Sequence, residues 1–269
     1  MAVLAMQSAA SGLRALDTRL DVIANNLANV NTEGFKSSRV NFEDLLYIER
    51  AQPGTENNNG DQRPTGLYVG LGVRVSGTQQ DFTQGPPIPG TSPLDMMIEG
   101  RGFFKVAVET DLGEGGFAYT RMGNFVLNSN GTIVLANSDG RILDPEITIP
   151  PTAENISIDA SGRIFASLPG TAVPTEVGQI QLSVFINPAG LTQVGTNLWT
   201  ESAASGPPIE GIPGTDNFGT VRGGMLEGSN VDPSRELIEL IRTQRAFEMN
   251  SQAIRAADET LQSVAQLRR

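Results

Sequence analysis

The stretch MQSAASGLRALDTRLDVIANNLANV, from Met6 to Val30, decides how the chain begins to fold. Its apolar residues alternate at spacings of three and four positions, at Met6, Ala9, Leu13, Leu16, Leu20, Ile23, Leu27 and Val30. This spacing is the a/d pattern of a coiled-coil seam, so it predicts a long helix with one narrow apolar stripe. The motif Asn31-Thr32-Glu33-Gly34 supplies the stop, because glycine is favoured just after the last helical turn.

A second long helix is predicted at the other end of the chain. Asp232 is a good N-cap residue, and Pro233 suits the first helical position, where no backbone N–H is needed. The helix can then run to the C-terminus. Its stripe is less uniformly apolar and consists of Leu240, Phe247, Ile254 and Leu261 at intervals of seven, with Thr243, Asn250, Ala257 and Val264 between them. Arg235 with Glu239, and Arg255 with Glu259, are expected to form exposed pairs four residues apart.

The middle of the chain consists of short apolar runs separated by turn residues, which predicts an all-β domain. Strands are expected at residues 103–108, 117–120, 125–127, 132–135, 147–149, 156–158, 164–166 and 179–186. Asn130-Gly131 and Asp139-Gly140 are expected hairpin turns. Residues 52–66 and 203–219 have no apolar period and are interpreted as loop segments. The predicted fold class is α+β, with N- and C-terminal helices forming a coiled-coil-like α domain and a central all-β domain.

Composition excludes most catalytic chemistry. The 269 residues contain no His and no Cys, which removes histidine bases, thiolate nucleophiles, zinc fingers and disulfides. A net charge of −11 argues against nucleic acid as a partner, because phosphate binding needs a surface rich in Lys and Arg. No apolar run is long enough to span a membrane, and no basic segment precedes Met1–Met6 as in a cleaved signal peptide. We therefore expect neither membrane insertion nor signal cleavage.

Three motifs resemble parts of known binding or catalytic sites, but none of them matches the full pattern of such a site. Gly100-Arg101-Gly102 begins like a dinucleotide loop but lacks the third glycine and precedes a strand. The stretch 128–131 resembles part of a calcium loop, yet the closing glutamate is absent and a hairpin turn explains it better. Glu43-Asp44 could act as a glycosidase pair only beside another carboxylate in a cleft, which the spacing does not predict. We expect no enzyme activity, no cofactor and no metal.

The terminal stripes need a partner. The two helices are separated by about 200 residues of β-rich sequence, and each offers only a narrow seam. They can pair with each other, but a two-helix unit leaves much of its seam uncovered. The most economical remaining partner is another copy of the same chain.

Several motifs closely resemble those of the bacterial flagellar rod and hook protein family. The N-terminal motif is ANNLANVNTEGFK at 24–36, and the C-terminal motifs are SNVD at 229–232, ELI at 236–238 and QRAFEMNS at 244–251. In the middle, IEGRGFF at 98–104 and YTRMGNF at 119–125 are similar to strands of the family's β domain. The resemblance covers essentially the whole chain.

The resemblance implies a structural subunit of the flagellar axis. Hook subunits are considerably longer, and FEDLLY at 42–47 with GLYVGLGVR at 66–74 looks like the insertion of the distal rod type. The implied product is a rigid, hollow, homo-oligomeric tube that spans the periplasm and carries torque from motor to hook. The implied partners are proximal rod subunits, the hook protein, periplasmic and outer-membrane ring proteins, and the export apparatus, which passes the chain without signal cleavage.

The resemblance also implies a domain organisation. Residues 1–35 with 228–269 form a channel-lining assembly domain, 36–70 a connecting segment with the insertion, and 71–227 a β-rich outer domain. The residues expected at the subunit interface are Leu13, Leu16, Leu20, Ile23, Asn25, Asn26, Leu27, Asn29, Val30, Phe35, Leu240, Phe247, Ile254 and Leu261. Two alternatives stay open: another axial subunit, either proximal rod or short hook-type, and a secreted β-rich adhesin with a helical stalk.

Overall fold

The structure, a computed structural model, describes residues 2–54, 63–109, 114–153, 155–169 and 173–267. Its contacts divide the chain into two units. Unit 1 comprises Met1–Ala28, Ser38–Gln80 and Asp232–Arg269, and unit 2 comprises Asn29–Ser37 and Asp81–Val231. Two long helices and a large β-rich region confirm the α+β class. The sequence predicts boundaries after residues 35, 70 and 227, whereas the contacts place boundaries after residues 28, 37, 80 and 231.

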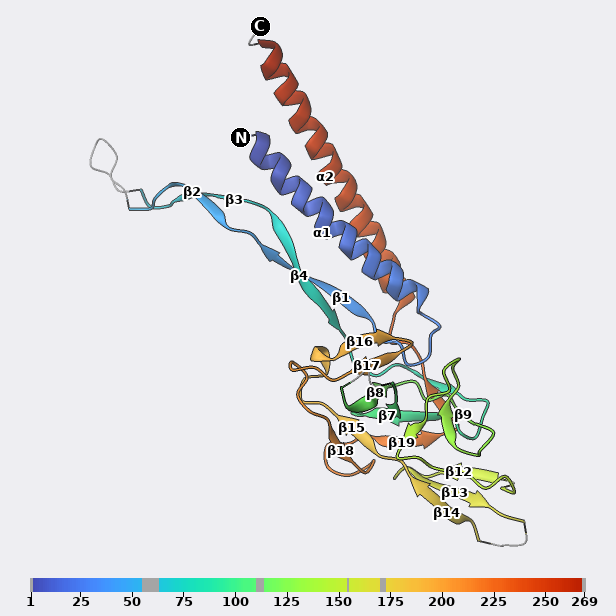
Figure 1. Ribbon diagram of the computed structural model, residues 1–269. Coiled ribbons are helices and arrows are strands. Elements are labelled where there is room, and N and C mark those ends of the chain that lie inside the picture. The colour runs from blue at the N-terminus through green and yellow to red at the C-terminus, as the bar shows by residue number, and fades with distance from the viewer. Residues whose placement is uncertain (1, 55–62, 110–113, 154, 170–172, 268–269) are drawn as a thin grey trace. The chain divides into compact units, whose positions relative to one another are not determined.

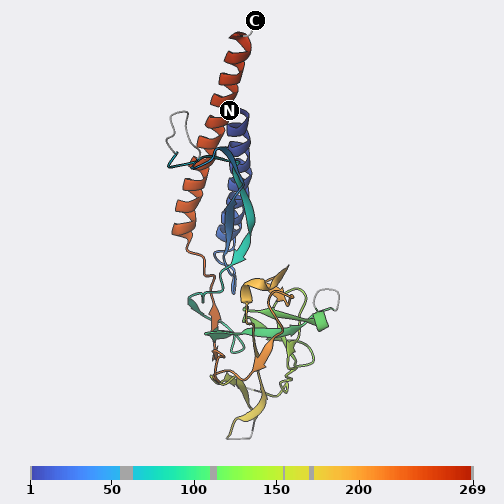
Figure 2. The ribbon, with the colours of Figure 1, turned by 90° about the vertical axis from the view of Figure 1, so that its left-hand side faces the viewer.

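Unit 1 contains both terminal helices, α1 (Ala2–Ala28) and α2 (Pro233–Leu267). They lie side by side and run antiparallel in both views of the ribbon (Figures 1 and 2). The predicted start of α2 is confirmed, because Asp232 Oδ1 accepts hydrogen bonds from the backbone N–H groups of Ser234 at 2.9 Å and Arg235 at 3.3 Å. These bonds satisfy two of the amide groups that the first helical turn leaves without a helical partner.

Unit 1 also contains a β ribbon that the sequence analysis does not predict. Strand β1 (Ser38–Asp44) pairs antiparallel with β4 (Val73–Gln80), and β2 (Tyr47–Ala51) pairs with β3 (Leu67–Gly70). Both β1 and β4 contact α1. The apolar alternation that marks a strand is short here: it is limited to Val40 and Phe42 in β1 and to Val73 and Val75 in β4, and polar residues and Gly77 fill the rest of both strands.

A glycine holds this ribbon against α1. Gly72 has φ +116°, and a Cβ atom on it would collide with the Ser11 hydroxyl of the helix. The same hydroxyl accepts a hydrogen bond from the Val73 backbone N–H at 3.2 Å and donates to the Ser8 carbonyl at 2.7 Å. Only glycine allows the backbone both this conformation and this close approach.

The strands of unit 2 form one large sheet and several small ones. The large sheet has seven strands in the order β16-β17-β8-β7-β15-β18, with β11 paired to β7. Its strands are β7 (Phe103–Ala107), β8 (Phe117–Thr120), β11 (Leu143–Asp144), β15 (Leu182–Val184), β16 (Thr192–Gly195), β17 (Leu198–Thr200) and β18 (Ile209–Gly211). The smaller sheets are made of β5 (Pro87–Pro89) with β20 (Met225–Glu227), β6 (Met96–Glu99) with β19 (Thr220–Gly223), β9 (Phe125–Leu127) with β10 (Ile133–Leu135), and β12 (Asn155–Ile158), β13 (Arg163–Ser167) and β14 (Thr175–Gln179).

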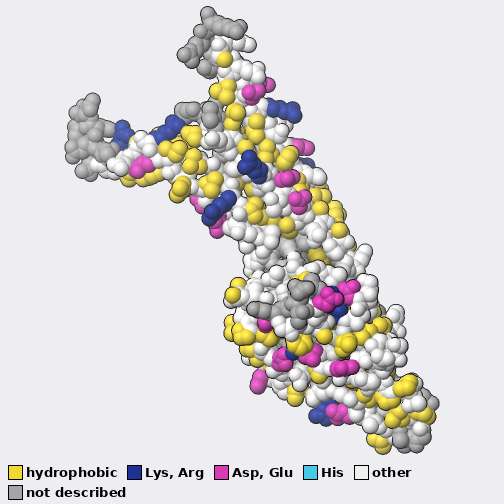
Figure 3. All heavy atoms as spheres, in the orientation of Figure 1, with side chains coloured by type: hydrophobic (Ala, Val, Ile, Leu, Met, Phe, Trp, Pro, Cys, Tyr) yellow, Lys and Arg dark blue, Asp and Glu magenta, His cyan; other side chains and the backbone are white. Residues whose placement is uncertain are grey.

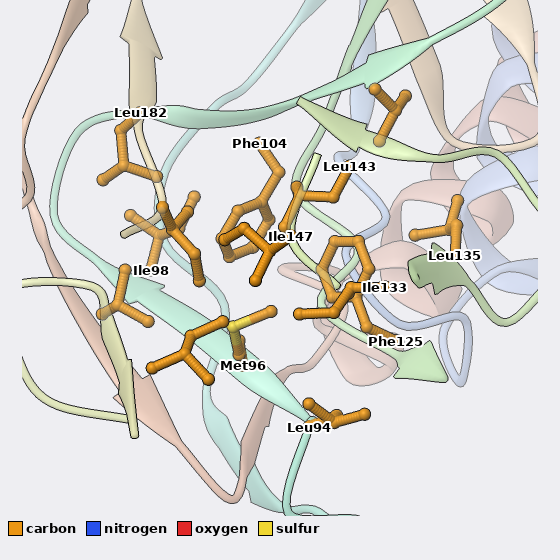
Figure 4. Close-up of a cluster of buried hydrophobic side chains, with 14 of the residues drawn as sticks. Leu94, Met96, Ile98, Phe104, Phe125, Ile133, Leu135, Leu143, Ile147 and Leu182 are labelled. Atoms are coloured by element: carbon orange, nitrogen blue, oxygen red, sulfur yellow. The ribbon is translucent and has the colours of Figure 1, made fainter. Parts of the chain in front are cut away.

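Two clusters of buried side chains cover the two faces of strand β7. Phe104 points into the main core, where its ring meets that of Phe125 edge-on at 5.3 Å (Figure 4). The adjacent Phe103 points to the other face, into an aromatic cluster with Tyr119, Phe185 and other residues. Because successive residues of a strand face opposite ways, one Phe-Phe pair anchors both clusters.

Two strand predictions are wrong in part. Residues 147–149 form only an isolated bridge, although Ile147 and Ile149 are buried. The expected strand at 179–186 is interrupted, because β14 ends at Gln179 and β15 spans only Leu182–Val184. Phe185, just beyond the end of β15, enters the aromatic cluster, and Ile186 is 76% exposed.

One predicted loop region contains a strand, and one predicted turn is confirmed. Residues 203–219 contain a strand, β18, which pairs with β15. The turn at Asn130-Gly131 is confirmed between β9 and β10, with φ +78° at Gly131. It is organised by Asn128, whose Oδ1 accepts hydrogen bonds from the N–H groups of Asn130 and Thr132, both at 2.9 Å.

A fully buried ion cluster lies in unit 2. Lys36 Nζ donates to Glu227 Oε1 at 2.6 Å and to the Thr83 carbonyl at 2.7 Å. Arg121 Nη1 donates to the other oxygen of Glu227 at 3.2 Å, and the Gly85 N–H donates to Oε1 at 2.9 Å. Burial lowers the pKa of both cations, and the Glu227 carboxylate opposes that shift. One carboxylate thus holds two cations from distant parts of the sequence.

Asn230 joins the same three segments of unit 2 through hydrogen bonds. Its Oδ1 accepts from the Ser37 N–H at 2.8 Å, and its Nδ2 donates to the Asp81 carbonyl at 2.7 Å. The Asp81 N–H in turn donates to the Ser37 carbonyl at 2.8 Å. The short segment 29–37 is therefore tied into the β-rich unit by both charge and hydrogen bonding.

We expect Gly72→Ala to destabilise unit 1 by about 1–3 kcal/mol, because the new Cβ meets Ser11 and the backbone is strained. Urea unfolding followed by circular dichroism at 222 nm reports unit 1, which contains both long helices. Gly77→Ala is the matched control on β4, since nothing lies within 4 Å of its Cβ position, and it should change stability by less than about 1 kcal/mol. Equal effects of the two substitutions contradict the anchoring role.

We expect Glu227→Gln to destabilise unit 2 by about 3–5 kcal/mol, because it leaves two buried cations without their counter-charge. Fluorescence of Trp199, which is buried in this unit and is the single tryptophan, reports its unfolding. The control is Glu99→Gln, which breaks an exposed pair with Arg222 and should cost less than about 1 kcal/mol. A loss of similar size in both variants argues against the cluster as a stabilising element.

Candidate assembly surface

The contact between α1 and α2 is close along much of its length. Ile23 of α1 is 5% exposed and Thr243 of α2 is 2% exposed. At the other end, a Cβ atom on Gly12 would lie 3.2 Å from Asn250 Nδ2, so the lack of a side chain at Gly12 lets the helices approach. The two terminal helices therefore contact each other within one chain.

Asn26 connects three elements of unit 1. Its Oδ1 accepts from the Ser38 N–H at 3.0 Å, and its Nδ2 donates to the Ser38 carbonyl at 2.9 Å, so the side chain pairs with β1 as a neighbouring strand does. Nδ2 also lies 3.3 Å from Glu236 Oε1 on α2. Burial raises the pKa of Glu236, and the hydrogen bond from Asn26 acts in the opposite direction. Asn26 thus fixes α1, β1 and α2 relative to one another.

The charges of the helix pair do not form the predicted pairs along α2. Arg19 Nη2 of α1 donates to Glu239 Oε2 at 2.6 Å, and Arg242 Nη1 donates to Glu239 Oε1 at 3.0 Å. Glu239 therefore pairs with Arg19 across the helix contact and with Arg242 three residues later on α2. The predicted pair of Glu239 with Arg235 is wrong. The Arg19 guanidinium also lies 5.9 Å from the centre of the Phe42 ring on β1.

The predicted interface residues differ in how far their own chain covers them. Ile23 and Asn26 are buried, and Asn25 and Phe247 are exposed. The half-buried members in unit 1 are Leu13, Leu16, Leu20, Leu27, Leu240, Ile254 and Leu261, and those in unit 2 are Asn29, Val30 and Phe35. Their contact with a second copy stays a prediction.

Sequence reasoning missed an apolar surface on α2. Leu237, Ile238, Ile241 and Met249 are 46%, 51%, 49% and 63% exposed, and we call them the α2 outer face. Successive helical residues are about 100° apart, so Ile241 points away from Thr243 and α1. The spacing of Leu237, Ile238 and Ile241, at positions i, i+1 and i+4, already indicates an apolar face in the sequence. The prediction used instead the stripe that repeats every seven residues from Leu240, which lies on another side of the helix.

A second exposed apolar surface lies on the ribbon. Leu46, Tyr47, Leu67 and Tyr68 are 82%, 57%, 55% and 52% exposed, and we call β2, β3 and Leu46 the arm. Hydrophobic side chains are visible along the arm and the helices in Figure 3. Monomeric proteins rarely leave such surfaces bare unless a partner covers them.

The described residues contain no group of three or more acidic side chains placed to hold a metal ion. No helix among them is long and apolar enough to cross a membrane. The surfaces that stand out are apolar, which suits contact with protein.

Three protein-family descriptions match separate parts of the chain. "Flagella basal body rod protein" matches residues 6–36, "Flagellar hook protein FlgE/F/G D1 domain" matches 97–166, and "Flagellar basal body rod FlgEFG protein C-terminal" matches 222–267. The first includes most of α1, the last includes all of α2, and the middle one includes much of the core of unit 2.

Individual relatives align over almost the whole chain. The flagellar basal-body rod protein FlgG of Caulobacter vibrioides is 44% identical over 266 residues, which cover 98% of this chain and 99% of that protein. FlgG of Borreliella burgdorferi is 42% identical over 267 residues, 98% of each chain. The flagellar hook protein FlgE of Escherichia coli is 24% identical in an alignment over 424 residues. Because full-length similarity to the rod proteins exceeds 40% identity, this chain belongs to the family of flagellar basal-body rod proteins.

Proposed function

We propose that this chain is a structural subunit of the flagellar distal rod, and that its copies assemble into a rigid hollow tube that transmits torque from motor to hook. The observation that carries the proposal is the full-length alignment with FlgG proteins at 44% and 42% identity, against 24% for the hook protein. The sequence features at 42–47 and 66–74 point the same way.

In this proposal unit 1 drives assembly. The helices act as a coiled-coil-like pair that lines the channel, and the α2 outer face meets another copy. Fully burying an Ile or Leu side chain stabilises by roughly 1.5–3 kcal/mol, so several half-exposed side chains provide a substantial driving force. The same contact recurs at every subunit of a tube.

Unit 2 then forms the outer surface of the rod. We propose that it faces the periplasmic and outer-membrane ring proteins, while the ends of the tube meet proximal rod subunits and the hook protein. The chain reaches this place through the flagellar export apparatus without signal cleavage. The proposed role is mechanical, so it includes no catalytic step and no cofactor.

The arm is proposed to stiffen the tube by contacting neighbouring copies. Its described part carries the exposed Leu46, Tyr47 and Tyr68, and residues 55–62, which follow β2 and precede β3 in sequence, lie outside the described residues. A two-stranded ribbon is marginally stable alone, so a neighbour that covers these side chains also stabilises the arm.

We expect Ile241→Asp to abolish tube formation while leaving the fold of the chain intact, because Ile241 is half exposed in one chain. Ile23→Asp should instead unfold unit 1, since it places a charge at a buried position of the helix contact. Electron microscopy of concentrated protein checks assembly, and circular dichroism checks folding. Ile241→Val is the control that should still assemble. Tubes formed by Ile241→Asp at the wild-type concentration contradict assembly through the α2 outer face.

Replacing residues 52–66 by Asn-Gly should leave a chain that folds and assembles, because this two-residue turn can join β2 to β3. The tubes should bend more easily than those of the unmodified chain. Their persistence length in electron micrographs is the measurement. Shortened-arm tubes that are as straight and stiff as before count against a stiffening role.

A further inference from the structure

Resting on the proposed assembly, we propose which surface of a second copy covers the α2 outer face. The ridge formed by Leu237, Ile238 and Ile241 seats in an apolar groove at the opposite end of unit 1 of the next copy. The groove lies among the start of α1, the arm and the later part of α2. Its lining is mainly small or apolar, with Ala5, Val69, Gly70 and Ala256, and it includes one charged side chain, Arg50.

The groove suits bulky apolar side chains. It has a volume of about 750 Å³, and small residues such as Ala5, Gly70 and Ala256 make up much of its walls. The ridge is the complement, since its three branched side chains stand half exposed on a helix. Large side chains that enter spaces above small ones are the usual basis of close packing between elements.

Other grooves of unit 1 fit the ridge less well. One, of about 220 Å³, is lined by charged and polar groups that include Arg19, Asn26 and Glu239. Another, of about 380 Å³, includes Arg14 and Arg74 in its lining. Burying an apolar ridge against these grooves would remove the Arg19–Glu239 and Arg74–Glu43 ion pairs from water, which is costly for charged groups. Of the three grooves compared, the one beside Ala256 is the largest and the most apolar.

Symmetry supports a contact between different surfaces. If two ridges met face to face, the contact would be used up in a closed dimer, whereas a contact between two distinct surfaces continues indefinitely and builds an open helical assembly. A rod requires the second kind. Ile238 and Ala256 are 18 residues apart on α2, so parallel copies joined in this way are displaced by about 27 Å along the helix.

Cross-linking tests the contact directly, because the chain contains no cysteine. We would introduce Ile238→Cys and Ala256→Cys together, assemble the protein, and treat it with a short bis-maleimide. The double variant should give a ladder of covalent oligomers on a denaturing gel. Each single variant should give no cross-linked product, and an equal mixture of the two should stop at dimers. Leu237→Cys with Ala257→Cys is the second pair if the first variant does not assemble.

The outcomes separate this contact from the proposed function. Tubes that yield no ladder from either double variant overturn the contact and leave the distal-rod proposal standing. Dimers from Ile238→Cys alone show a face-to-face contact and also overturn it. The control pair is Ile238→Cys with Ile186→Cys, in which Ile186 is an exposed residue of unit 2. A ladder from this pair shows that the ridge contacts unit 2 of the next copy, and it overturns the proposed contact with the groove. Failure of the unmodified chain to form any tube contradicts the proposed function itself.

Discussion

The organisation of unit 1 depends on the unequal covering of its two helices. Helix α1 contacts α2 as well as β1 and β4, whereas the main partner of α2 is α1. Apolar residues on the far side of α2 therefore remain half exposed. Since exposed apolar area costs roughly 25 cal/mol per Å², this surface favours association.

Polar contacts determine how α1 is covered. Asn26 pairs with the backbone of Ser38 and reaches Glu236, and Gly72 brings the ribbon onto Ser11. Buried polar groups are costly unless they are paired, so these contacts favour one arrangement of helix and ribbon over its alternatives. A subunit that must repeat the same contact many times benefits from a single defined surface.

Unit 2 has its own means of holding its chain segments together. The Lys36–Glu227–Arg121 cluster and Asn230 bind the segment 29–37 to the β-rich region. Breaking a buried ion pair costs far more than breaking an exposed one. The residues next to the helices therefore belong firmly to unit 2, which retains its own core and aromatic cluster.

Sequence patterns predicted the features that rest on local rules. The a/d spacing and the Asp232 cap gave both helices, and short apolar runs gave most strands of the core. The ribbon β1–β4 was not predicted, because its burial comes from α1, far from β4 in sequence. Lys36 stood within a recognised motif, but its counter-charge lies 191 positions away. The outer face of α2 was not predicted, because a helix can have two apolar sides. Periodicity alone does not show which of these sides is buried against the rest of the same chain.

In assembled tubes, a neighbouring copy is expected to cover the outer face of α2. Oxidative labelling of the unmodified chain, dilute and in tubes, measures this directly, because Met249 lies on that face and is 63% exposed. Met97, which is 2% exposed in unit 2, serves as the internal reference. We expect Met249 to oxidise readily in the dilute chain and to become protected in tubes, with Met97 protected in both. Equal oxidation of Met249 in the two states would contradict the account.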